Sequence, residues 1–175
     1  MSLDTRLERW VVHHRLHVLD DVFVGLSRVG SQGAIWILIA VLAAFYWRRP
    51  AIFLYVTLAD LIAGVSSALL RHAIGRERPP LRFPEPHPLV HVPGNPSFPS
   101  GHAATSFACA ATLAWLTPLS PVALYALAAL IAFSRVYVGV HYPLDVIGGA
   151  ALGLGVATAL RLLVEARRRS APRPR

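Results

Sequence analysis

The chain has 175 residues, of which 55% are hydrophobic and only 15% are charged, and its mean hydropathy is +0.52. Soluble domains carry roughly a quarter of charged residues, so this composition argues against a soluble protein and favours one membrane-embedded domain over residues 1–175. All 17 basic residues are arginine, and the formal net charge is +8. Basic residues at membrane edges explain this charge, and no nucleic-acid partner is predicted.

The N-terminal segment, residues 1–21, mixes charged residues with apolar residues at roughly helical spacing. It lacks the apolar core and small-residue cleavage site of a secretory signal. The pattern is typical of a helix lying in the membrane interface, and a helix packed on the bundle is an equally good interpretation.

Apolar segments dominate the rest of the chain and are separated by short polar connections. About 20 apolar residues cross a hydrocarbon core as a helix. The sequence therefore predicts an all-α, integral-membrane helical bundle with about five transmembrane helices. These are expected near residues 25–47, 51–70, 101–117, 121–138 and 145–163.

The predicted spans decide which connections share a membrane face. The loop 71–100, rich in proline and arginine, and the segment 134–145 fall on one face, whereas Arg48, Arg49 and the basic tail 165–175 fall on the other. Arginine in short loops marks the cytoplasmic side. We expect a multi-pass protein of the cell membrane whose polar face is extracytoplasmic.

Chemistry-bearing residues gather on that polar face in three clusters. Guanidinium groups offer planar, bidentate donors to phosphate oxygens. A helix that opens after Pro99 would direct free backbone N–H groups at an anion. The candidate phosphate-binding residues are Arg71, Arg78, Ser100, Gly101 and Arg135.

Two histidines and a carboxylate accompany these donors. Asp145 follows His141 by four residues, across a proline suited to the first turn of a helix. A carboxylate can fix one imidazole nitrogen so that the other attacks. His102 is then available to donate a proton to a departing oxygen.

The pattern Arg71-x6-Arg78-Pro79, Pro99-Ser100-Gly101-His102 and Ser134-Arg135-x5-His141-x3-Asp145 closely resembles the three-part signature of the type 2 phosphatidic acid phosphatase superfamily. The resemblance implies that His141 is a nucleophile forming a phosphohistidine, that Asp145 orients it and that His102 is the general acid. It implies phosphate binding by Arg71, Arg78, Arg135, Ser100 and the Gly101 amide, with no metal and no cofactor. The family's first motif usually begins with lysine, and Arg71 stands there instead.

The resemblance implies a hydrolase that removes phosphate from a lipid in the bilayer. A bacterial polyprenyl diphosphate phosphatase of cell-wall recycling is the first expectation, with undecaprenyl diphosphate converted to the monophosphate. Phosphatidic acid and phosphatidylglycerol phosphate are alternative substrates, because the motifs recognise only the phosphate. A non-catalytic protein that binds anionic lipid would need the arginines but not the spacing of His141 and Asp145.

Other polar residues receive structural interpretations. Cys109, the only cysteine, is expected to be a small buried hydrophobic residue. Glu85, His87 and His91 show no known metal-ligand spacing, and solvation of the loop is favoured. Asp60 lies midway along a predicted span, a costly position, and we expect a structural partner for it inside the bundle.

Overall fold

The structure is a computed structural model that describes residues 1–170, except for the side chain of Gln32. All regular elements in this part of the chain are helical, as the sequence predicts. Four helices begin with proline, whose missing N–H is not needed in a first turn. The elements are α1 (Leu3–His13), α2 (His17–Val29), the 3-10 turn η1 (Ser31–Gly33), α3 (Ala34–Tyr46), α4 (Pro50–Ile74), α5 (Pro79–Arg82), α6 (Gly101–Leu116), α7 (Pro121–Tyr137) and α8 (Pro143–Ser170).

The N-terminal segment 1–21, predicted as one helix, is divided between α1 and α2. The hydroxyl of Ser2 caps α1 by accepting a hydrogen bond from the Thr5 amide at 3.3 Å. Beyond α1, the guanidinium of Arg15 donates to the carbonyls of Tyr137 and His87, both at 2.8 Å. Arg15 thus ties the connection 14–16 to α7 and the long loop, and local periodicity gives no signal of such a distant contact.

The predicted first span, residues 25–47, is not one helix. It comprises the end of α2, η1 and α3, and the axes of α2 and α3 differ by 64°. Gly33 at the bend has φ +69°, and a Cβ there would lie 2.2 Å from Oδ1 of Asp60, so only glycine fits this position. Asp60 therefore packs against the bend from α4, which is the kind of structural partner expected for it.

Two helical stretches in the described residues are long and apolar enough to cross a membrane: α8 and the stretch that begins with α4 at Pro50. The bent pair of α2 and α3 would make a third. The apolar helix α7 is shorter, with 17 residues, and α6 has 16. The apolar helices indicate a membrane protein, and the predicted number of five spans stays a prediction.

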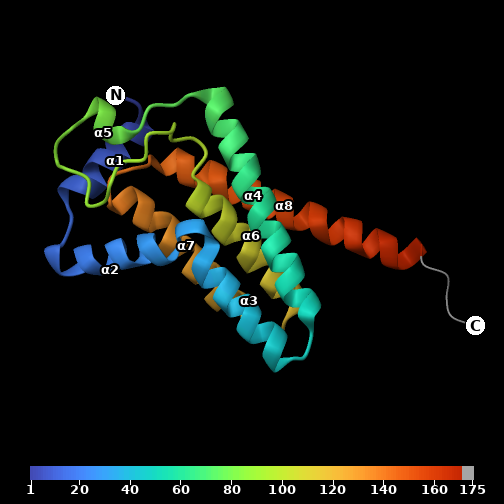
Figure 1. Ribbon diagram of the computed structural model, residues 1–175. Helices are drawn as coiled ribbons and strands as arrows, with labels where there is room; N and C mark the ends of the chain where they lie inside the picture. The colour runs from blue at the N-terminus through green and yellow to red at the C-terminus, as the bar shows by residue number, and fades with distance from the viewer. Residues whose placement is uncertain (171–175) are drawn as a thin grey trace, which may run out of the picture.

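Helix α6 lies at the centre of the bundle, with α4, α7 and α8 packed against it (Figure 1). Gly149 and Gly153 are one turn apart on α8, where a Cβ would come within 2.4 Å of the Ser100 carbonyl and 2.2 Å of the Ala104 carbonyl. Small residues let helix backbones approach closely in membranes. Cys109 of α6 is completely buried in the bundle, as expected.

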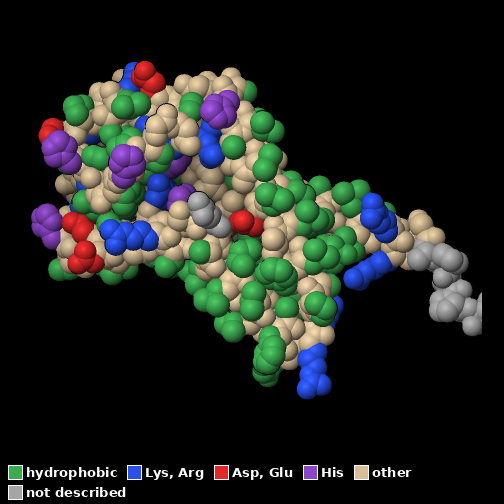
Figure 2. Space-filling view, viewed as in Figure 1, with side chains coloured by type: hydrophobic (Ala, Val, Ile, Leu, Met, Phe, Trp, Pro, Cys, Tyr) green, Lys and Arg blue, Asp and Glu red, His purple; other side chains and the backbone are tan. Residues whose placement is uncertain are grey.

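The two ends of the bundle differ. The short helices α1 and α5 and the loop leading into α6 cover the end where α6 and α8 begin (Figure 1). The α3–α4 turn and the end of α8 lie away from α1, and arginine side chains project there (Figure 2). The predicted active-site loop 71–100 is helical as far as Ile74 and again in α5.

Candidate active site

All three sequence motifs line one cavity of about 270 Å³. Arg71 comes from the last turn of α4, Arg78 precedes α5, and Arg135 lies in the last turn of α7. His102 belongs to the first turn of α6 and His141 to the connection between α7 and α8. The predicted meeting of these residues at one end of the bundle is therefore observed.

His141 is almost fully buried, with 2% of its surface exposed. Its Nδ1 lies 3.3 Å from Oδ2 of Asp145, and its Nε2 lies 3.0 Å from a terminal nitrogen of Arg78. A guanidinium can only donate, so Nε2 is the acceptor and Nδ1 carries the proton that points at Asp145. Burial lowers the pKa of His141 to about 4, which keeps the imidazole neutral and its Nε2 unprotonated at neutral pH.

Asp145 is completely buried. It holds the imidazole of His141 and also two backbone segments. Its Oδ2 accepts a hydrogen bond from the Tyr142 amide at 3.0 Å, and its backbone carbonyl accepts one from the Ser100 amide at 2.8 Å. This second bond fastens the start of α6 to the start of α8. His141, the predicted nucleophile, and the helix end expected to bind phosphate are thus held by one residue.

Arg78 and Arg135 are buried cations, with 3% and 5% of their surfaces exposed. Arg78 donates to the carbonyls of Asn95 at 2.8 Å and Val140 at 2.9 Å. Arg135 donates to the hydroxyl of Ser27, while its buried Nε has no partner within residues 1–170. Their acceptors are neutral groups, and among the described residues no carboxylate forms an ion pair with either guanidinium, so both can attract an anion in the cavity.

Two further predicted phosphate-binding residues lie at the start of α6, and of these Gly101 lines the cavity whereas Ser100 does not. The Ser100 hydroxyl is buried and has no hydrogen-bond partner among the described residues. A Cβ on Gly101 would lie 2.8 Å from a terminal nitrogen of Arg71, so glycine leaves room for this guanidinium. Arg71 donates to the hydroxyl of Ser67 at 3.3 Å. The arginine that replaces the usual lysine therefore still reaches the cavity.

His102 is held by a residue that the sequence did not single out. Its Nε2 lies 3.2 Å from the backbone carbonyl of Ser27 in α2. A carbonyl only accepts, so this nitrogen carries a proton. Because the Ser27 hydroxyl also accepts from Arg135, one residue of α2 orients two predicted site residues.

A second hydrogen-bond network, centred on Arg76, was not predicted from the sequence. Arg76 donates to Oδ1 of Asp145 at 2.6 Å and to Oδ2 of Asp4 at 2.5 Å. Asp4 also accepts a hydrogen bond from the Leu144 amide at 2.8 Å. The helix α1 is thereby joined through Arg76 to the carboxylate beside His141. Only the position of Arg76 within the first motif could have suggested a role for it.

Residues 1–170 contain no group of three His, Cys, Asp or Glu side chains arranged to hold a metal ion. His87 forms an exposed pair with Glu85, with 3.0 Å between Nε2 and Oε1. His91 is also exposed. This loop is solvated, which was the favoured interpretation of its histidines.

Comparison with known proteins identifies the family. The pattern of the PAP2 superfamily matches residues 50–169, about two thirds of the chain. The chain belongs to the PAP2 superfamily. An undecaprenyl-diphosphatase of Sulfolobus acidocaldarius is 32% identical over 155 residues, covering 87% of this chain and 74% of that protein.

Two further relatives extend this result. A decaprenylphosphoryl-5-phosphoribose phosphatase of Mycobacterium tuberculosis is 34% identical, covering 85% of this chain and 82% of that protein. The crystal structure of a transmembrane PAP2-type phosphatidylglycerolphosphate phosphatase from Bacillus subtilis superposes with a TM-score of 0.76 at 27% identity, covering 96% of this chain and 87% of that one. The matched fold includes the N-terminal helices that precede the family pattern.

Proposed function

We propose that this member of the PAP2 superfamily is a membrane phosphatase that hydrolyses a lipid phosphate through a phosphohistidine at His141. The observation that carries the proposal is the hydrogen bonding of His141, whose Nδ1–H faces Asp145 and whose Nε2 lone pair faces Arg78 inside the cavity. A protein that only bound anionic lipid would need the arginines, but it would not need an imidazole held in this tautomer.

The reaction takes place in two steps. Nε2 of His141 attacks phosphorus, the bond from phosphorus to the lipid oxygen breaks, and that oxygen keeps the electron pair and takes a proton from His102, whose protonated form the bound phosphate anion favours. Water then attacks the phosphoryl group, His102 takes its proton, and inorganic phosphate leaves with His141 restored. Arg71, Arg78, Arg135, Ser100 and the Gly101 amide hold the phosphoryl oxygens, where charge grows in the transition state.

The positive charge at the site supports a reaction without a metal ion. Phosphoryl transfer needs cations and donors around the equatorial oxygens, and buried guanidiniums together with the α6 N-terminus supply them. We therefore propose that turnover is independent of metals and cofactors. Activity that was lost with EDTA and restored by one divalent ion would contradict this part of the proposal.

A polyprenyl diphosphate, converted to the monophosphate as in cell-wall carrier recycling, is the proposed substrate. The similarity to an undecaprenyl-diphosphatase and to a phosphatase of a decaprenyl lipid supports it. Phosphatidylglycerol phosphate is the second candidate, favoured by the similarity to the Bacillus subtilis structure, and phosphatidic acid is the third. The test is phosphate release by purified protein from these lipids, in the presence of EDTA, with His141→Ala as the inactive control.

We also propose five crossings of the cell membrane, by residues 25–47 (the end of α2 together with α3) and by α4, α6, α7 and α8, with the site on the extracytoplasmic face. The basic end of α8 then lies in the cytoplasm. In a Cys109→Ala background, single cysteines at Gly94 and Ser170 report the two faces. In intact cells an impermeant thiol reagent should label the Gly94 position and spare the Ser170 position. Reversed labelling would place the chemistry in the cytoplasm, and labelling of both would change the number of spans.

A further inference from the structure

A second cavity, of about 600 Å³, lies between α2 and the loop that follows α5 and is named the outer cavity. It adjoins the cavity of about 270 Å³ that the three motifs line, which is named the phosphate cavity or inner cavity. Four residues line both cavities, namely Ser31, Pro93, His102 and Arg135. The space-filling view shows histidine and arginine side chains around a hollow at this end of the molecule (Figure 2). The outer cavity therefore meets the phosphate cavity beside the proposed general acid.

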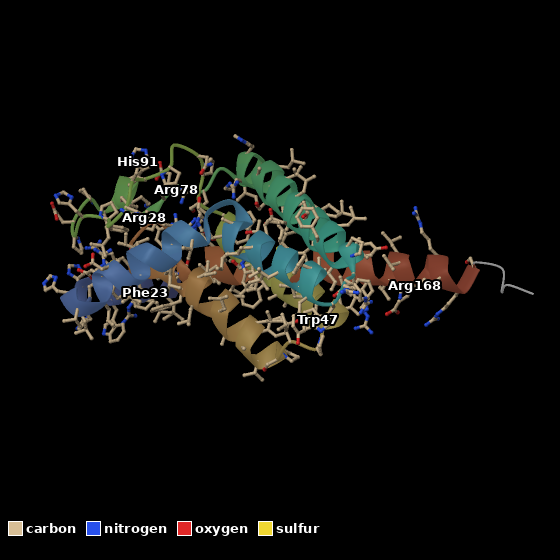
Figure 3. All side chains as sticks on the ribbon, turned by 60° about the horizontal axis from the view of Figure 1, so that its bottom comes forward. Phe23, Arg28, Trp47, Arg78, His91 and Arg168 are labelled. Carbon is tan, nitrogen blue, oxygen red and sulfur yellow. The ribbon has the colours of Figure 1, made fainter. Side chains whose placement is uncertain are left out.

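Two basic side chains, Arg28 and His91, line the outer cavity but not the inner one. Arg28 lies in the last turn of α2, and His91 lies in the facing loop. Both are found at the same end of the molecule as Arg78, far from Arg168 (Figure 3). Among residues 1–170 neither forms an ion pair, and no Asp or Glu lines either cavity.

Arg135 links the two cavities. Its side chain is buried, one terminal nitrogen is used by the Ser27 hydroxyl, and its Nε has no acceptor in the described structure. A buried donor without an acceptor is unfavourable, so an anion at the junction of the cavities would satisfy it. The outer cavity thus combines four nitrogen-bearing side chains, those of Arg28, His91, His102 and Arg135, with no carboxylate in its described lining.

We infer that the outer cavity binds a second phosphate group, held by Arg28 and His91, and that the preferred substrate is a lipid diphosphate. The inference rests on the proposed function, because it uses His102 as the acid. His102 stands where the cavities meet, so the oxygen that it protonates lies at the junction and the leaving group extends into the outer cavity. In a lipid diphosphate the leaving group continues with a charged phosphate, whereas in a monoester it continues with an uncharged carbon.

The kinetic test compares two substrates with the same tail, farnesyl diphosphate and farnesyl monophosphate. Removing a charge-assisted contact to the second phosphate should lower kcat/KM for the diphosphate by about 10-fold more than for the monophosphate. This result is expected for Arg28→Gln and, to a smaller extent, for His91→Gln. Arg6→Gln is the matched control, because Arg6 is an exposed arginine of α1 that lines neither cavity. Parallel losses on both substrates, or no loss, would overturn the inference.

A binding measurement separates this inference from the proposed function. Calorimetric titration of the full chain in detergent should show that methylenediphosphonate, which cannot be hydrolysed, binds more tightly than methylphosphonate. Arg28→Gln should remove most of that difference, whereas Arg6→Gln should keep it. If the wild type released phosphate from neither farnesyl substrate, the proposed function would fail, but this measurement would still test the subsite. An equal preference for the diphosphonate in the wild type and in Arg28→Gln would exclude a second-phosphate site at Arg28.

Discussion

Arginine lies at both ends of the bundle, in two different environments. At the far end, Arg167, Arg168 and Arg169 are exposed on the last turns of α8. At the site end, Arg78 and Arg135 are buried and donate to carbonyl and hydroxyl oxygens. The exposed side chains can adapt to the headgroups of any anionic membrane, whereas hydrogen bonds hold the buried guanidiniums in one orientation.

The difference shows what makes an arginine functional. Burying a guanidinium costs several kcal/mol unless a partner compensates it, and the usual partner is a carboxylate. The carboxylate beside the site, Asp145, pairs with Arg76 and His141 instead of with Arg78 or Arg135. Two buried guanidiniums without a carboxylate partner in the described residues are unfavourable when the cavity is empty and favourable when it holds phosphate.

The largest expected effect concerns the nucleophile at the site end. His141→Ala should lower kcat by about 1,000-fold or more, because no other side chain can form the covalent intermediate. Asp145→Asn should leave a small residual activity, since Nε2 is still present. Initial rates of phosphate release from detergent-purified protein measure both, with size-exclusion profiles as a check on folding. Near-normal turnover by His141→Ala would refute the phosphohistidine.

The next effect compares the two kinds of arginine directly. Arg78→Lys should lower kcat/KM by about 100-fold, because an ammonium cannot span Asn95, Val140 and a phosphate as the planar guanidinium can. Arg168→Lys, on the exposed end of α8, is the matched control and should change kcat/KM by less than about twofold. Similar losses in both variants would mean that burial does not distinguish the two ends.

A smaller effect is expected from the support that α1 gives to the site. Asp4→Asn keeps an oxygen for the Leu144 amide but removes the ion pair with Arg76. Arg76 should then hold Asp145 less firmly, lowering kcat by about 10-fold with little change in KM. Asp21→Asn, an exposed acid of α2, is the control. An effect on KM alone would show that Asp4 acts on lipid binding instead.

The smallest effect concerns stability. Burial raises the pKa of Glu8 to about 7, partly offset by Arg9 and Arg15, and in the described part of the chain its Oε2 has no hydrogen-bond partner. The unfolded carboxyl ionises near pH 4.5 and the folded one near 7, so stability is full below pH 4.5 and falls as pH rises to about 7. Glu8→Gln should remove this loss and raise Tm at pH 8 by about 2–5 °C, with no change at pH 4. An equal rise in Tm at pH 4 and pH 8 would show that the ionisation of Glu8 is not the cause.

The three sequence motifs predicted which residues meet at the cavity. Their spacing placed Arg71, His102 and His141 at helix ends, and the alternation of apolar spans put those ends on one face. Pro99, two residues before α6, and Pro143, the first residue of α8, indicated where these helices begin. The roles assigned to these residues stay predictions, as does the count of five spans.

Sequence by itself determined the membrane-embedded helical class and the residues that meet at the cavity, because hydropathy and motif spacing are local properties. Tertiary structure alone decided the bend at Gly33, the link from Asp4 through Arg76 to Asp145, and the contacts of Ser27 with His102 and Arg135. These depend on residues far apart in the chain, including pairs 72, 75 and 108 positions apart. Their pairing is set by how α1, α2 and α4 pack on the bundle, and no periodicity within one segment encodes it.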